Sequence, residues 1–170
     1  YNPKGLDIAD VLHRYRDKHE PLREIKLGES ISNEELLQLD CTVLVPAALS
    51  EQITHANASK LRCRILAEGA NGPTTLEADR ILTDKGVFII PDILANSGGV
   101  IVSYFEWVQD VQRFFWKAKD IQDRLQDIIT SAFHRTLNFS LERRTTMRMA
   151  ALMSGIDKVA QAHLQRGLYP

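Results

Sequence analysis

The chain has 170 residues, of which 44% are hydrophobic and 25% charged, a composition typical of a folded globular domain rather than a disordered chain. Its 21 basic and 22 acidic residues are spread along the sequence, so no charged field favours nucleic acid or an anionic membrane. No apolar run approaches the roughly 20 residues of a membrane helix, and the first residues lack a signal-peptide pattern. We therefore expect no nucleic-acid or membrane partner and a cytoplasmic protein, with mitochondrial residence left open.

Before residue 41 the pattern predicts two helices. Apolar residues at helical spacing indicate an amphipathic helix from Asp7 to about His19, before the break at Pro21. Ser32 and Glu35 have the spacing of a capping box, so a short helix is expected to about Leu39. The opening run YNPKG lacks Met and is typical of a turn that continues from an earlier segment. We expect an incomplete chain, with a processed end as the alternative.

Three short runs of apolar, largely β-branched residues predict strands that are buried on both faces of a parallel sheet. They span residues 41–45, 63–67 and 87–90. The only cysteines, Cys41 and Cys63, lie in or beside these runs, so we expect buried free thiols rather than a disulfide.

Helices are expected between the strands, near residues 54–61 and from Thr75 to Lys85, the second capped by Thr74 and closed by Gly86. Strands that alternate with helices predict an open α/β sheet. About three strands are roughly half the number in a doubly wound nucleotide domain. After residue 98 the periodicity is helical to the end, with helices expected over residues 99–115, 120–143 and 146–167.

The loops that follow the three strands are the candidate ligand site, because open α/β sheets bind ligands at the carboxyl ends of their strands. These loops are rich in small residues and contain Asn71 and Asn96. A carboxamide side chain offers both a donor and an acceptor without charge, which suits the amide of a nicotinamide. The alternative is that both asparagines, with Gly72 and Gly98-Gly99, are turn residues that tolerate positive φ.

Other polar residues give weaker signals. The five histidines are scattered without the spacing of metal ligands or of a Ser-His-Asp triad, so no metal is expected. Arg143, Arg144 and Arg148 are typical of a solvated helix end, with a phosphate or subunit contact as the alternative.

Several stretches together resemble the glutamate dehydrogenases, within the family that also acts on leucine, phenylalanine and valine. The resemblance rests mainly on EGANGPTT (residues 68–75), VFIIPDILAN (87–96) and GGVIVSYFEW (98–107). YNPKGLD (1–7), VPAA (45–48) and the ending RGLYP (166–170) resemble the same family. The full VSYFEW run favours glutamate over the other amino acids as the substrate.

The resemblance implies the second half of a Rossmann-like dinucleotide-binding domain over residues 1–115, followed by C-terminal helices over residues 116–170. It implies that Asn71 and Asn96 hold the nicotinamide ribose and carboxamide of NAD or NADP, and that Ala48 lines the adenosine side. Val100 and Ser103 correspond to the substrate pocket, where Ser103 would hydrogen-bond the side-chain carboxylate of glutamate. The implied reaction converts L-glutamate to 2-oxoglutarate and ammonia, in an enzyme that is usually a homo-hexamer.

Three parts of that family's machinery have no match in the sequence. The Gly-rich phosphate-binding turn, the acidic residue that reads the adenosine ribose, and the substrate domain with its lysine and aspartate are all missing. We therefore expect no catalytic residue in this chain and no activity of the chain alone. Three other interpretations stay open: a non-catalytic nucleotide-sensing or interaction module, a dehydrogenase for leucine, phenylalanine or valine, and another α/β enzyme with a phosphorylated ligand.

Overall fold

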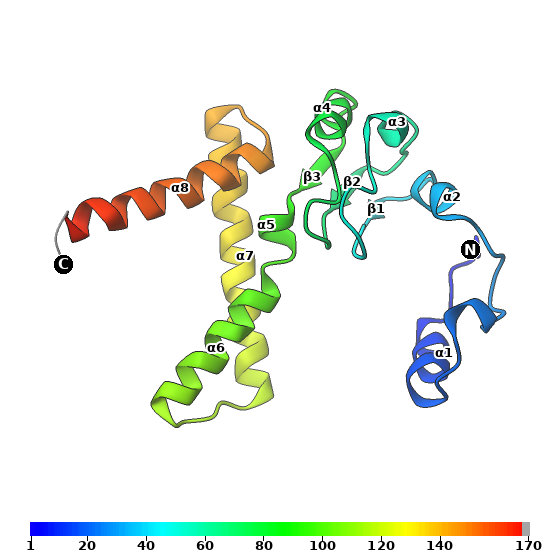
Figure 1. Cartoon of the computed structure of the whole chain (residues 1–170), viewed down its shortest axis with the longest axis horizontal. Coiled ribbons are helices and arrows are strands. Elements are labelled where there is room, and N and C mark those ends of the chain that lie inside the picture. Colours follow the sequence, from blue (N-terminus) through cyan, green and yellow to red (C-terminus); the bar gives the residue numbers. More distant parts are fainter. Residues whose placement is uncertain (168–170) are drawn as a thin grey trace. The chain divides into compact units, whose positions relative to one another are not determined.

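The computed structural model describes residues 1–167 and divides into two compact units, residues 1–40 and residues 41–170. The last three residues of the expected C-terminal segment lie outside the described residues. The fold is mixed α/β with one small parallel sheet (Figure 1). The domain boundary expected after residue 115 stays a prediction.

The first unit contains short helices. Helix α1 (Ile8–Leu12) begins at Asp7, whose side chain accepts from the Asp10 amide, and continues as the π-helical turn η1 (His13–Asp17). The 3₁₀ turn η2 (Leu22–Glu24) follows the break at Pro21. Ile8, Leu12 and Tyr15 are 58%, 41% and 51% exposed, so the apolar stripe that predicted the first helix is not buried within its own unit.

Helix α2 (Asn33–Leu37) confirms the predicted capping box. The Ser32 hydroxyl accepts from the Glu35 amide at 3.2 Å, and the Ser32 amide donates to the Glu35 carboxylate at 2.7 Å. These two bonds satisfy amides that the first turn of a helix leaves without partners. The hydrogen bond from the Ser32 backbone, assisted by its hydroxyl, holds the pKa of Glu35 below its ordinary value.

The second unit is built on three parallel strands in the order β1-β2-β3. They are β1 (Val43–Leu44), β2 (Ile65–Ala67) and β3 (Phe88–Ile90), and each is shorter than the apolar run that predicted it. Leu66 of β2 pairs with Leu44 on one side and Ile89 on the other. The central strand therefore fixes the register of both neighbours.

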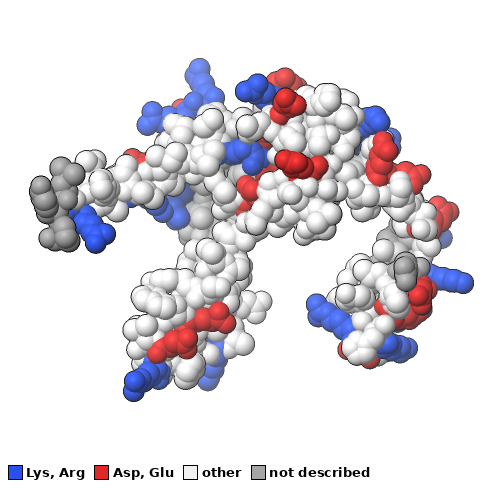
Figure 2. All heavy atoms as spheres, in the orientation of Figure 1, with Lys and Arg blue, Asp and Glu red and all other residues white. Residues whose placement is uncertain are grey.

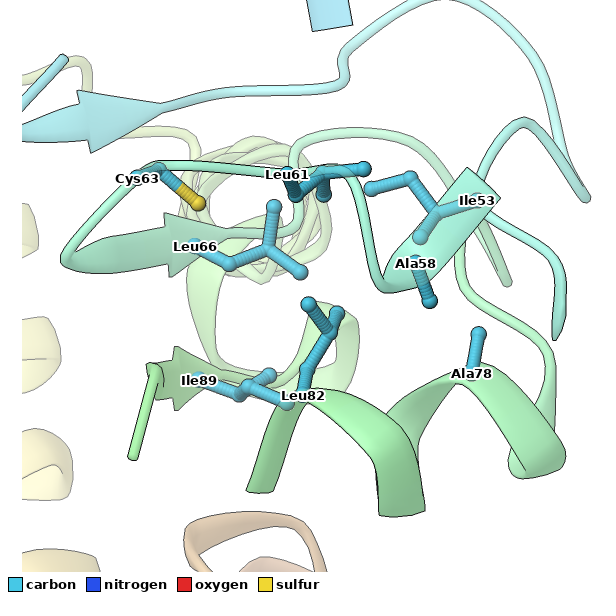
Figure 3. Packing of buried hydrophobic residues seen from close by; sticks show 8 residues of the cluster. All are labelled: Ile53, Ala58, Leu61, Cys63, Leu66, Ala78, Leu82 and Ile89. Atoms are coloured by element: carbon cyan, nitrogen blue, oxygen red, sulfur yellow. The ribbon is translucent and has the colours of Figure 1, made fainter. Parts of the chain in front are cut away.

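Two crossover helices, α3 (His55–Ala58) and α4 (Leu76–Asp84), pack on this sheet. Leu66 and Leu82 are fully buried, and in Figure 3 the Leu82 side chain on α4 points toward the strands. Cys63 is buried in the same cluster, and Cys41 packs against it. Neither forms a disulfide, as predicted, but the expected burial is found only at Cys63, because Cys41 is half-buried. Burial raises the pKa of the Cys63 thiol.

The expected cap of the second crossover helix was wrong by one residue. Thr75, not Thr74, precedes α4 and accepts from the Ala78 amide at 3.3 Å. Thr74 is instead buried, and no described residue hydrogen-bonds its hydroxyl. Gly86 follows the helix with a φ of 78°, a conformation that glycine adopts at little cost.

The remaining residues form helices α5 (Asp92–Ala95), α6 (Gly98–Gln112), α7 (Ala118–Arg143) and α8 (Met147–Arg166). The single turn of α5 was expected as loop. Helix α7 contacts α5, α6 and α8 (Figure 1). Over residues 1–167, no helix is both long enough and apolar enough to cross a membrane.

Candidate coenzyme site

The three loops that leave the carboxyl ends of the strands surround one open cavity of about 880 Å³. Parallel strands end at the same edge of a sheet, which brings these loops together although they are far apart in the sequence. The cavity is lined by Ala48, Leu49, Ser50, Gly69, Ala70, Asn71, Ile93, Asn96, Ser97 and Val100. Of the five residues predicted for the site, Ala48, Asn71, Asn96 and Val100 therefore meet at one place.

Ser103 is the exception. It lies on α6 in the turn after Val100, is exposed, and is not among the residues that line the cavity. Its role toward the substrate stays a prediction.

Asn71 and Asn96 are joined directly. The Asn96 side-chain amide donates to the Asn71 side-chain oxygen at 2.7 Å, which ties the loop after β2 to the end of α5. Neither asparagine has a positive φ, whereas Gly72 beside Asn71 has a φ of 54°. The glycine thus supplies the left-handed turn, and the two asparagines are not there to tolerate that conformation.

This pair has the chemistry that an uncharged amide ligand requires. A carboxamide has two N–H donors and an oxygen with two acceptor positions, so one mutual hydrogen bond uses only part of each side chain. Asn71 is exposed and Asn96 is half-buried, and both line the cavity. The donors and acceptors left over can therefore reach a ligand from two adjacent loops.

An ion-pair network centred on Arg148, in the first turn of α8, lies next to the two segments that carry Asn71 and Asn96. Arg148 donates from Nη2 to Glu68 Oε1 at 2.7 Å and from Nε to Asp79 Oδ1 at 2.9 Å, and its Nη1 lies 3.5 Å from Asp92 Oδ1. The Arg148 side chain is 17% exposed and Glu68 is fully buried. The expectation of a solvated helix end was therefore wrong for Arg148.

Burial by itself would lower the pKa of the Arg148 guanidinium, but its contacts with Glu68 and Asp79 outweigh burial and raise that pKa. Arg148 is therefore a permanent cation among three carboxylates. On the face drawn in Figure 2, by contrast, basic and acidic side chains are interspersed with wide uncharged areas.

Sequence reasoning missed the Arg148 network. The one signal was Glu68, a carboxylate placed directly after an apolar strand, where a buried charge requires a partner. Among residues 1–167, no three His, Cys, Asp or Glu side chains are grouped in a way that could hold a metal ion.

Comparison with known proteins supports the resemblance. Residues 1–167 match the model of the Glutamate/Leucine/Phenylalanine/Valine dehydrogenase family. A glutamate dehydrogenase of Thermotoga maritima is 46% identical over all of this chain and 41% of its own length. The cryptic catabolic NAD-specific glutamate dehydrogenase of Bacillus subtilis is 45% identical over 98% of this chain and 39% of its own length.

A solved structure agrees with the sequence matches. The hetero-hexameric glutamate dehydrogenase of Thermus thermophilus, in a Leu-bound form, superposes with a TM-score of 0.88 at 30% identity. That match covers 100% of this chain and 40% of the neighbour, so the chain spans about two fifths of the proteins that it resembles. On the family match and these identities, the chain belongs to the Glutamate/Leucine/Phenylalanine/Valine dehydrogenase family.

Proposed function

We propose that this chain forms the coenzyme-binding part of a glutamate dehydrogenase, an enzyme that converts L-glutamate to 2-oxoglutarate and ammonia with NAD or NADP. The observation that carries the proposal is the Asn71–Asn96 pair, held at the carboxyl edge of the sheet on the wall of a large cavity. In this proposal residues 1–115 are the second half of a Rossmann-like domain, and residues 116–170 are its C-terminal helices.

The two asparagines would hold the nicotinamide ribose and carboxamide, and Ala48 would line the adenosine side of the same cavity. The coenzyme, when bound, accepts a hydride from the substrate. The contribution of this chain is orientation, because uncharged hydrogen bonds fix a flat ring against the loops and leave its redox equilibrium undisturbed. The Bacillus subtilis relative is named NAD-specific, which makes NAD the first coenzyme to test.

The substrate would approach from α6. Val100 is 74% exposed and lines the cavity, and Ser103 lies in the next turn of the same helix. A hydroxyl there can donate to the side-chain carboxylate of glutamate, and the nearby helix N-terminus also favours an anion. We therefore assign Val100 and Ser103 to the substrate side of the site.

No catalytic residue is assigned to this chain. We propose that the lysine and aspartate of the family mechanism lie in the part of the enzyme that these 170 residues do not cover. We also propose a hexamer, since the Thermus thermophilus neighbour is named hetero-hexameric. We propose that six copies of one subunit form it, and that it is located in the cytoplasm.

The test is a chimaera in which this chain replaces the matching 41% of the Thermotoga maritima enzyme. It should form NADH or NADPH when glutamate is added. Asn96→Ala should raise the Michaelis constant for the coenzyme about tenfold, because one or two neutral hydrogen bonds are worth roughly 0.5–1.5 kcal/mol each. Asn138→Ala, at an exposed position on α7, is the matched control and should leave the Michaelis constant for the coenzyme unchanged.

The same chimaera separates the other interpretations. Preference for leucine, phenylalanine or valine would make the chain part of a different dehydrogenase in the family. Dinucleotide binding without turnover of any amino acid would support a sensing module, and no dinucleotide binding would refute the proposal. Ser103→Val should raise the Michaelis constant for glutamate and favour apolar amino acids; an unchanged profile would remove Ser103 from the pocket.

A further inference from the structure

We infer that Arg148 is a positioning residue for the coenzyme site, holding the Asn71 loop and helix α5 in the arrangement that joins Asn71 to Asn96. The identity of the ligand rests on the proposed function. The positioning itself rests only on the contacts below.

The contacts form a continuous path from α8 to the asparagine pair. Arg148 holds one oxygen of the Glu68 carboxylate, and the other oxygen accepts from the Asp92 amide at 2.9 Å. The Asp92 carboxylate in turn accepts from the Gly72 amide at 2.9 Å. Gly72 adjoins Asn71, so the path that begins at α8 ends next to the loop that it fixes.

Asn96 is fixed from the same residue. Asp92 is the first residue of α5. Its backbone amide donates to Glu68, and its Oδ1 accepts from the Ile93 amide at 2.8 Å, so these two bonds hold the start of the helix. Asn96 follows the last residue of α5, and its backbone amide donates to the Asp92 carbonyl at 2.9 Å. A shift of Asp92 therefore moves both asparagines.

Only arginine fits this position. The planar guanidinium reaches three carboxylates, on the loop after β2, on α4 and on α5, from three different nitrogens. Lysine would keep the charge but has one nitrogen, which cannot contact all three carboxylates as the guanidinium does. The fully buried Glu68 would then lack its partner beside Asp92, and repulsion between these two carboxylates would break the hydrogen bonds that lead to Asn71.

The network also links distant segments. Arg148 and Glu68 are 80 residues apart, and α8 contacts β3 and α7. The position of α8 is therefore transmitted to the asparagine pair through one side chain.

The test is a spectroscopic one on the 170-residue chain without nucleotide. The side-chain amide resonances of Asn71 and Asn96 are assigned in ¹⁵N spectra with single Asn→Ala variants and followed in Arg148→Lys. We expect both asparagine side chains to shift in Arg148→Lys. The matched control is Arg124→Lys, at an arginine that stacks on Trp116 away from the cavity, and it should leave both in place.

The Michaelis constant for the coenzyme is then measured in the chimaera described above, with and without Arg148→Lys, because the chain alone lacks the phosphate-binding turn. We expect this constant to rise about tenfold in Arg148→Lys, the effect of losing one well-placed hydrogen bond. Unchanged asparagine resonances in Arg148→Lys would overturn the positioning role. A chimaera that binds neither NADH nor NADPH would count against the proposed function alone.

A variant that does not fold would not end the test. If Arg148→Lys is unfolded, Asp92→Asn replaces it, because a carboxamide oxygen cannot serve the Gly72 amide, the Ile93 amide and Arg148 together. It should shift both asparagine amides. A folded Asp92→Asn chain with both resonances unmoved would refute the path.

Discussion

Replacing Arg148 with methionine should lower the free energy of unfolding of the second unit by about 3 kcal/mol. Methionine retains an unbranched apolar stem, so the main loss is the charge that compensates Glu68, which is fully buried, and Asp79, whose side chain is 13% exposed. Removal of one partner from a buried ion pair costs about 3–5 kcal/mol. The lower end applies because Glu68 keeps the hydrogen bond from the Asp92 amide.

Urea unfolding followed by tryptophan fluorescence measures this loss, because both tryptophans, Trp107 and Trp116, lie in the second unit. The matched control is Lys119→Met, which breaks a 2.7 Å ion pair with Asp123 whose side chains are 80% and 57% exposed. Exposed pairs contribute about 0–1 kcal/mol, so this variant should be close to wild type.

A double variant tests the cause of the loss. Adding Glu68→Gln to Arg148→Met removes the buried uncompensated charge, so the double variant should be more stable than Arg148→Met alone. A loss of stability in Arg148→Met no larger than that in Lys119→Met would contradict the burial of an uncompensated charge. So would additive effects of Arg148→Met and Glu68→Gln, measured singly and together.

Three further predictions follow from single side chains. Because the pKa of Glu35 is lowered in the folded state, its carboxylate stabilises α2 above the ordinary glutamate pKa of about 4.5, and this contribution is lost as pH falls through the folded-state pKa. Glu35→Gln should therefore make the helicity of α2, measured by NMR, depend less on pH under acid conditions. Alkylation by iodoacetamide, followed by mass spectrometry, should label the half-buried Cys41 before the buried Cys63, whose pKa burial raises; equal rates would contradict the packing. Gly69→Ala would place a Cβ 2.9 Å from the Ala47 Cβ, and should destabilise by about 1–3 kcal/mol in urea unless the loop gives way.

Much of the fold could be predicted because each signal is local. The apolar runs before Pro46 and Pro91 are too short and too rich in β-branched residues for helices, and they form parallel strands. The ends of elements were harder to place. Thr74 and Thr75 are equally good caps in sequence, and the choice is made by burial of Thr74, which depends on tertiary packing.

The π-helical turn η1 was also out of reach of periodicity. Tyr15 continues the helical spacing of the apolar residues in α1, but the Lys18 amide donates to the His13 carbonyl, one residue further back than in an α-helix. Arg14 forms two hydrogen bonds to Glu20 just beyond the turn, at 2.7 and 2.5 Å. These Arg14–Glu20 bonds span the end of η1, and the spacing of apolar residues carries no information about them.

The candidate site divides in the same way. Asn71 and Asn96 could be singled out because each follows a predicted strand, and the carboxyl ends of parallel strands must share an edge. Arg148 could not, because its partner Glu68 is 80 residues away and the sequence has 21 lysines and arginines to choose from.

The physical requirement was nevertheless present in the sequence at Glu68. A carboxylate at the end of a buried strand is too costly to leave without a cation and hydrogen-bond donors. The fold meets that requirement with a side chain from α8 and a backbone amide from α5. Because the same carboxylate adjoins the asparagine loops, the interactions that stabilise the buried charge also set the geometry of the site.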